Sequence, residues 1–244
     1  MPDSKPKATR RVNDILLGRF ERRALPWMAA RLPGWVSPDG LTAVALGGAL
    51  VSSIAYALAG ENLAWLHLAS FGLVVHWWGD SLDGTVARVR QIRREKYGFF
   101  VDHQCDAVSA VMLTVGMGAG SLMRMDVALA ICVGVLMLML LVNMVTIARG
   151  VFKISFSGIG PTELRLIAIL FNTAVWAAGP RSVAVAGREW PLFDLLGIVG
   201  VVGLAGFYVV SAVRETRLIA RLDPTPAPGT DGIAYDPTGQ QRRD

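Results

Sequence analysis

Long stretches without a charged side chain constrain this chain more than any other feature of its sequence. They cover residues 41–60, 63–79, 107–123, 127–148, 166–179 and 195–213. Because about 20 apolar residues are needed to cross a bilayer as a helix, most of these stretches have nearly the required length. The fifth is shorter and reaches that length only if its helix begins near Pro161, a residue type favoured in the first helical turn. The sequence therefore predicts an all-α, polytopic membrane protein with six transmembrane helices.

The composition and the placement of charge agree with this prediction. Hydrophobic residues make up 53% of the chain and charged residues only 18%, which excludes an ordinary water-soluble domain. With the N-terminus in the cytoplasm, all but three of the 24 Lys and Arg fall on the cytoplasmic side; the exceptions are Arg124, Arg181 and Arg188. This bias predicts that both termini face the cytoplasm. The net charge of +5 then reflects a lipid bilayer as partner rather than a nucleic acid.

The N-terminal segment 1–36 is predicted to be cytosolic and to contain a helix that lies in the membrane interface. Between residues 12 and 32, apolar side chains recur at helical spacing among arginines, as in an interfacial helix. The residues on this apolar side are Val12, Ile15, Leu16 and Phe20. An ordinary cytosolic helix is an equal alternative, because Pro26 interrupts the pattern.

The rest of the chain divides into a membrane domain, 37–221, and a C-terminal tail, 222–244. The tail is rich in Pro, Gly and polar residues, so we expect it to be disordered. No segment shows a strand signal.

Four aspartates at the borders of apolar stretches are the main candidates for a functional site. At 100° per residue, Asp80 and Asp83 lie on one stripe of the second predicted helix, and Asp102 and Asp106 stack along one face of the third. The two helices are joined by a short basic loop and are expected to be antiparallel neighbours. The four carboxylates should therefore converge near the cytoplasmic surface.

Carboxylates held this close repel one another unless hard cations lie among them. An all-oxygen set of ligands favours Mg²⁺ or Mn²⁺ over zinc, and four carboxylates can bridge two ions. Gly84, Ala87 and Gly98 leave space on the same helix faces for a flat or bulky ligand. Paired metals beside such a space indicate phosphoryl chemistry.

Two other interpretations of the aspartates remain open. They could be structural, with each carboxylate paired to a loop cation such as Arg88 or Arg90. They could also belong to a divalent-cation or proton-coupled transporter, which uses carboxylates within the membrane. A transporter needs polar groups through the middle of its helices, whereas these aspartates gather at one end. His76, one turn before Asp80, either supports the metal site or packs with a satisfied hydrogen bond.

The spacing of these residues resembles the signature of the CDP-alcohol phosphotransferase family, also called CDP-alcohol phosphatidyltransferases. That signature is D-x2-D-G-x2-A-R, eight or nine residues, then G-x3-D-x3-D. Its fixed positions are filled here by Asp80, Asp83, Gly84, Ala87, Arg88, Gly98, Asp102 and Asp106. The run SPDGLT, 37–42, is similar to the Pro-Asn-x-x-Thr that opens the first helix in the family, with Asp39 replacing the usual Asn.

The resemblance implies that a substituted phosphate passes from a CDP-linked donor to an alcohol, with release of CMP. It implies that Asp80, Asp83, Asp102 and Asp106 bind two Mg²⁺ or Mn²⁺ ions and that Asp106 is also the general base. The residues implied in nucleotide binding are Thr42, Gly84, Ala87, Arg88 and Gly98. A homodimer is implied as well.

A second set of polar residues is expected at the cytoplasmic mouth of the site, where it would bind the acceptor or a phosphate. It consists of Arg149, Lys153, Glu163, Arg165 and Arg214. For the basic members, the general excess of positive charge on the cytoplasmic side is the competing explanation.

Two substrate pairs are compatible with the resemblance. The six predicted helices are similar to those of bacterial enzymes that use CDP-diacylglycerol and a small polar alcohol, which favours that pair and a bacterial inner membrane. The runs GPTE, 160–163, and DHQCD, 102–106, instead resemble enzymes that join CDP-choline or CDP-ethanolamine to diacylglycerol. We keep that pair as the alternative.

Overall fold

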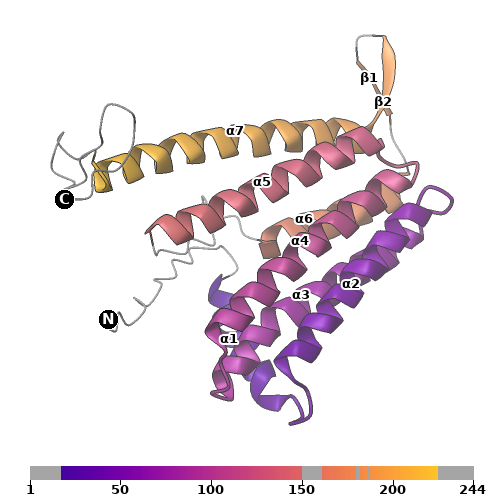
Figure 1. The fold of residues 1–244 in the computed structure, drawn as a ribbon. Coiled ribbons are helices and arrows are strands. Elements are labelled where there is room, and N and C mark those ends of the chain that lie inside the picture. The colour runs from indigo at the N-terminus through magenta and orange to yellow at the C-terminus, as the bar shows by residue number, and fades with distance from the viewer. Residues whose placement is uncertain (1–17, 150–160, 180–181, 186, 225–244) are drawn as a thin grey trace, which may run out of the picture.

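The computed structural model describes residues 18–149, 161–179, 182–185 and 187–224. This part of the chain forms seven helices and one short hairpin (Figure 1). The helices are α1 (Gly18–Arg31), α2 (Pro38–Leu58), α3 (Trp65–Val89), α4 (Glu95–Ala119), α5 (Met125–Arg149), α6 (Pro161–Ala178) and α7 (Leu192–Leu222). The strands are β1 (Ser182–Val185) and β2 (Arg188–Pro191). The predicted all-helical fold is confirmed, with the hairpin as its exception.

Two helix starts follow directly from local sequence. Ser37 caps α2 by accepting a hydrogen bond from the Gly40 amide at 3.0 Å, and Pro38 fills the first turn. Helix α6 begins at Pro161, as predicted.

Helices α2 and α3 form the tightest helix pair, because glycines let their backbones approach closely. A Cβ atom at Gly48 would lie only 2.5 Å from the His76 amide nitrogen, and one at Gly72 only 2.7 Å from the Gly48 oxygen. The Ser52 hydroxyl donates across this contact to the Ala69 carbonyl at 2.8 Å. Small residues at such a crossing are a common way to pack helices in membranes.

The other helices are arranged around this pair. Helix α4 also packs against α2, whereas α3 and α4 have few direct contacts with one another. Helix α6 packs on α3, and α5 and α7 run side by side (Figure 1). The main apolar core, which includes Tyr56, Leu66 and Phe193, lies at the end of the helices remote from the four aspartates. The aspartate end is thus less filled by apolar side chains.

Helix α1 is docked on α3 rather than separate from the helical domain. Leu25 and Ala29 pack against Leu82 and Val86 of α3 in a small apolar cluster. Phe20 is 63% exposed, and Pro26 lies inside the helix without ending it. Three residues of the predicted apolar side, Val12, Ile15 and Leu16, lie outside the described residues. The interfacial role of this segment therefore stays a prediction.

Within the described residues, three helices are long and apolar enough to cross a membrane: α2, α5 and α7. Helices α3, α4 and α6 fall short by this criterion, so the predicted six spans are confirmed only in part. Helices α3 and α4 carry the aspartates and neighbouring basic residues, which lowers their apolar character. Large exposed apolar side chains on the helices, such as Phe71, Leu140 and Val202, agree with an integral membrane protein.

No strand was predicted from the sequence, and this prediction is wrong for the segment before α7, which forms a hairpin. Ser182 pairs with Pro191 and Val185 with Arg188 in an antiparallel ladder. Gly187 adopts φ +75°, a left-handed conformation that glycine tolerates and that permits a tight turn. The alternating run SVAV was too short to give a sequence signal. Most of the predicted disordered tail, from residue 225, lies outside the described residues.

Candidate active site

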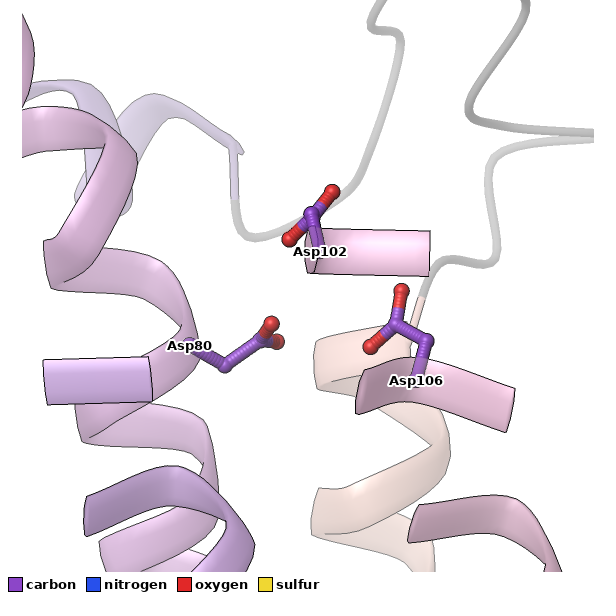
Figure 2. A group of neighbouring side chains, drawn as sticks. All are labelled: Asp80, Asp102 and Asp106. Carbon is purple, nitrogen blue, oxygen red and sulfur yellow. The ribbon is translucent and has the colours of Figure 1, made fainter. Parts of the chain in front are cut away.

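Three of the four predicted aspartates converge at the aspartate end of the helices. Asp80 comes from α3, and Asp102 and Asp106 come from successive turns of α4. One carboxylate oxygen from each lies within 4.8 Å of the others, and Figure 2 shows the side chains pointing toward one another. All three are half-buried. The two helices bring the carboxylates together although they have few direct contacts, because both pack on α2.

Asp83 is oriented differently from the other three. Its Oδ2 accepts a hydrogen bond from the Thr42 hydroxyl at 2.7 Å, and its Oδ1 accepts one from the Gly84 amide. Thr42, predicted to contact the nucleotide, therefore holds a predicted metal ligand. This contact joins the first turns of α2 to α3 beside the three-carboxylate group.

Arg165 of α6 reaches the same group of carboxylates. One of its guanidinium nitrogens lies 2.8 Å from Asp80 Oδ2 and 3.0 Å from His76 Nε2. The other ring nitrogen of the buried His76, Nδ1, is 3.1 Å from the Ala45 carbonyl. Donation from Nδ1 to that carbonyl leaves Nε2 as an acceptor, so this tautomer suits the arginine. The histidine thus supports Arg165, which neutralises one carboxylate of the group.

Small residues border open space next to the carboxylates. A Cβ atom at Gly98 would have no neighbour within 4 Å, and one at Gly84 would reach only the Arg88 side chain at 4.0 Å. Ala87 is half-buried, and Arg88 donates to the Thr85 hydroxyl at 2.7 Å. The structure therefore leaves room for a ligand along these predicted nucleotide-binding positions.

The predicted acceptor residues do not form one group. Arg165 pairs with Asp80, whereas Arg149 forms an ion pair with the buried Glu215 of α7. Arg214 is exposed and Glu163 is buried. Lys153 lies outside the described residues.

The substituted position Asp39 has a partner that sequence reasoning missed. Arg94 donates to both of its carboxylate oxygens, at 3.0 and 2.7 Å, and stacks over the Tyr97 ring at 3.8 Å. The Asp39 carboxylate raises the pKa of the Arg94 guanidinium. This exposed cluster joins the start of α2 to the start of α4, next to Gly98. The pair is separated by 55 residues, so no local pattern could have revealed it.

Comparison with known proteins agrees with this arrangement. The sequence model described as CDP-alcohol phosphatidyltransferase matches residues 35–212, which contain the aspartates, Thr42 and Arg165. The chain belongs to the CDP-alcohol phosphatidyltransferase family. The resemblance inferred from the motif is thereby confirmed.

Two curated relatives share moderate similarity with this family member. Cholinephosphotransferase 1 of Danio rerio is 27% identical over 187 residues, which are 71% of this chain and 48% of the relative. Cholinephosphotransferase 1 of Gallus gallus is 26% identical over 189 residues, or 71% of this chain and 54% of the relative. The chain thus spans about half the length of the curated relatives it matches.

Family membership indicates a transferase, and three of the described helices are long and apolar enough to cross a membrane. This favours the enzyme over the transporter and over a purely structural set of ion pairs. The three-carboxylate group is suited to hold a divalent metal ion of the kind that the family generally uses.

Proposed function

We propose that the protein transfers phosphocholine or phosphoethanolamine from its CDP ester to diacylglycerol. The name of the two relatives supports this pair of substrates over CDP-diacylglycerol and a polar alcohol, the pair that the number of predicted helices favoured. The GPTE and DHQCD runs at 160–163 and 102–106 resemble enzymes of the same kind and agree with it.

The observation that carries this proposal is the convergence of Asp80, Asp102 and Asp106. Oxygens that bind one Mg²⁺ or Mn²⁺ ion lie about 3 Å apart when adjacent and about 4 Å apart when opposite, so the three oxygens, which lie within 4.8 Å of one another, would move closer by side-chain rotation to share an ion. With Asp83 beside them, the carboxylates supply oxygen ligands for two ions. Bound ions would neutralise the pyrophosphate of the donor and make the attacking hydroxyl more acidic.

The protein side chains then have distinct tasks. The space proposed for the cytidine nucleotide is bordered by Thr42, Gly84, Ala87, Arg88 and Gly98. Asp106 accepts the proton of the diacylglycerol hydroxyl while the oxygen of that hydroxyl forms a bond to the β-phosphorus of the donor. The bond from that phosphorus to the oxygen of CMP breaks, and CMP leaves with the electron pair. We propose that the acceptor or a phosphate binds near the mouth of the site, at Arg149, Lys153, Glu163 and Arg214. Arg165, which pairs with Asp80, belongs to the same proposed set.

The placement of the enzyme in the membrane is also proposed. We infer six spans within residues 37–221, an interfacial segment in 1–36 and a disordered tail in 222–244. The positive charges near the aspartates support a site and termini that face the cytoplasm. The ground for proposing a bacterial inner membrane is the number of predicted helices. A homodimer is part of this proposal.

The test is an assay of CMP release by purified protein in nanodiscs with Mg²⁺ or Mn²⁺. Each CDP donor is paired with each acceptor, and we expect CDP-choline or CDP-ethanolamine with diacylglycerol to react. Asp106→Asn should lower the rate by about 10²-fold or more, because general bases contribute factors of that order. Asp126→Asn is the matched control, since Asp126 is exposed and pairs with Arg124 at the remote end. Release of CMP only from CDP-diacylglycerol would instead assign the other substrate pair.

A further inference from the structure

Glu21 of α1 joins three helices at a single carboxylate oxygen. Its Oε1 accepts a hydrogen bond from the Trp77 indole nitrogen of α3 at 3.2 Å and another from the Thr162 hydroxyl of α6 at 2.7 Å. Both donors are distant in sequence, by 56 and 141 residues, so this contact is created only by the fold. The side chain is half-buried.

Each donor lies about one helical turn before a residue of the active site. Trp77 precedes Asp80 on α3, and Thr162 precedes Arg165 on α6. Asp80 and Arg165 are themselves joined at 2.8 Å. The contacts therefore form a closed ring that runs from Glu21 along α3 to the carboxylates and back along α6.

Glu21 is a rigid part of this ring because its helix is fixed to α3. Leu25, one turn later on α1, packs with Ala29 against Leu82 and Val86. Helix α6 likewise makes its main helix contacts with α3, so α3 carries both partners of the Glu21 contact. A carboxylate is also favourable at the N-terminal turn of α6, where Thr162 is the second residue. The Thr162 hydroxyl thus ties the first turn of α6 to Glu21.

We propose that Glu21 is a positioning residue that fixes the start of α6 against α3 and so holds Arg165 at Asp80. This inference rests on the proposed transferase activity for its kinetic consequences. It assigns to the helix that precedes the membrane domain an indirect effect on the chemistry, through the position of Arg165. Glu21 itself does not touch the carboxylates.

The kinetic test compares Glu21→Ala with Glu21→Gln in the CMP-release assay. Loss of both hydrogen bonds in Glu21→Ala should lower kcat by about tenfold or more, since small displacements of reacting groups cost large factors, while KM for the CDP donor changes less than about threefold. The amide oxygen of Gln accepts the same two bonds, so Glu21→Gln should retain kcat within about threefold. Glu61→Ala, which removes an exposed carboxylate at the remote end, is the matched control.

A double-mutant cycle tests the partner on α6. Thr162→Val should reproduce part of the loss and Thr162→Ser should not, because Ser keeps the hydroxyl. Glu21→Ala combined with Thr162→Val should be no slower than Glu21→Ala alone, as expected for residues that act through one contact.

Hydrogen exchange supplies a measurement that does not need turnover. Peptides covering residues 161–166 should exchange faster in Glu21→Ala than in the wild type, Glu21→Gln or Glu61→Ala. If the wild type releases no CMP from any substrate pair, the proposed function fails while this measurement still decides the role of Glu21. Unchanged exchange in Glu21→Ala, or a kcat loss in Glu21→Gln as large as in Glu21→Ala, would overturn the inference.

Discussion

Asp83 illustrates how individual side chains in this site are fixed by donors from another helix. Its two oxygens are engaged by the Thr42 hydroxyl and the Gly84 amide. The sequence motif places Asp83 on the correct stripe of α3, but its rotamer is set by a residue 41 positions earlier. Hydrogen bonds to charged groups contribute about 1.5–3 kcal/mol, enough to select one orientation of the carboxylate.

We therefore predict that Thr42→Val, which keeps the side-chain shape and removes the hydroxyl, lowers the rate of CMP release by about tenfold or more. Thr42→Ser should stay close to the wild type. Thr173→Val is the control, because the exposed Thr173 hydroxyl bonds only to the Ile169 carbonyl within its own helix. A Thr42→Val variant as active as the control would show that Asp83 needs no support from α2.

The sequence predicted those parts of the candidate site that depend on the spacing of residues within one helix. Asp80, Asp102 and Asp106 were correctly expected to meet, because their spacing defines two opposed stripes. Arg165 was expected near the mouth, yet its bond to Asp80 spans 85 residues and leaves no local pattern. Glu21 was not singled out at all, since a lone acidic residue among arginines has no signal before the helices are packed.

At the scale of elements, the connection between α1 and α2 is held by one side chain. Arg90, just after α3, donates to the carbonyls of Leu32, Pro33, Gly34 and Val36, at 3.0, 2.9, 3.4 and 2.5 Å. A planar guanidinium can serve this many acceptors, whereas an ammonium cannot match its geometry. Sequence reasoning offered Arg90 only as a loop cation that could pair with an aspartate, because backbone acceptors carry no residue-type signature.

Arg90→Ala is expected to destabilise the protein by about 2 kcal/mol, because hydrogen bonds from a charged group are lost together. For a protein of this size, that corresponds to a fall in Tm of about 4–8 °C in a thermal unfolding assay in detergent. Arg93→Ala is the matched control from the same loop. Its ion pair with Glu95 is 3.8 Å long and exposed, so its loss should leave Tm within about 1 °C.

At the scale of the whole molecule, the positions of α2 to α7 along the chain followed from the apolar stretches, while two other features did not. Helices α3 and α4 were expected to pack directly together. Instead, both pack against α2, and the candidate site lies between them. The hairpin at 182–191 was not predicted because each of its strands has only four residues, too few to give a sequence signal. Small residues such as Gly48 and Gly72 explain why α3 packs on α2 rather than on α4. Their effect appears only when two helices are in contact, so the sequence of one helix does not reveal it.

The orientation of the whole molecule is tested by labelling single cysteines. Cys105 and Cys132 are replaced by Ser, and either Arg93→Cys or Glu61→Cys is introduced at an exposed position in an opposite connecting loop. The positive-inside bias predicts that a membrane-impermeant maleimide labels Arg93→Cys only in inside-out vesicles and Glu61→Cys only in spheroplasts. The reverse pattern would place the aspartates on the outer face.

The seam between α2 and α3 limits how a lipid can reach the aspartates. At Gly48 and Gly72 the two backbones are in direct contact, and no side chain lies between them that could rotate away. An acyl chain therefore cannot pass between α2 and α3 at this contact. A hydrophobic substrate must enter from a flank other than this seam.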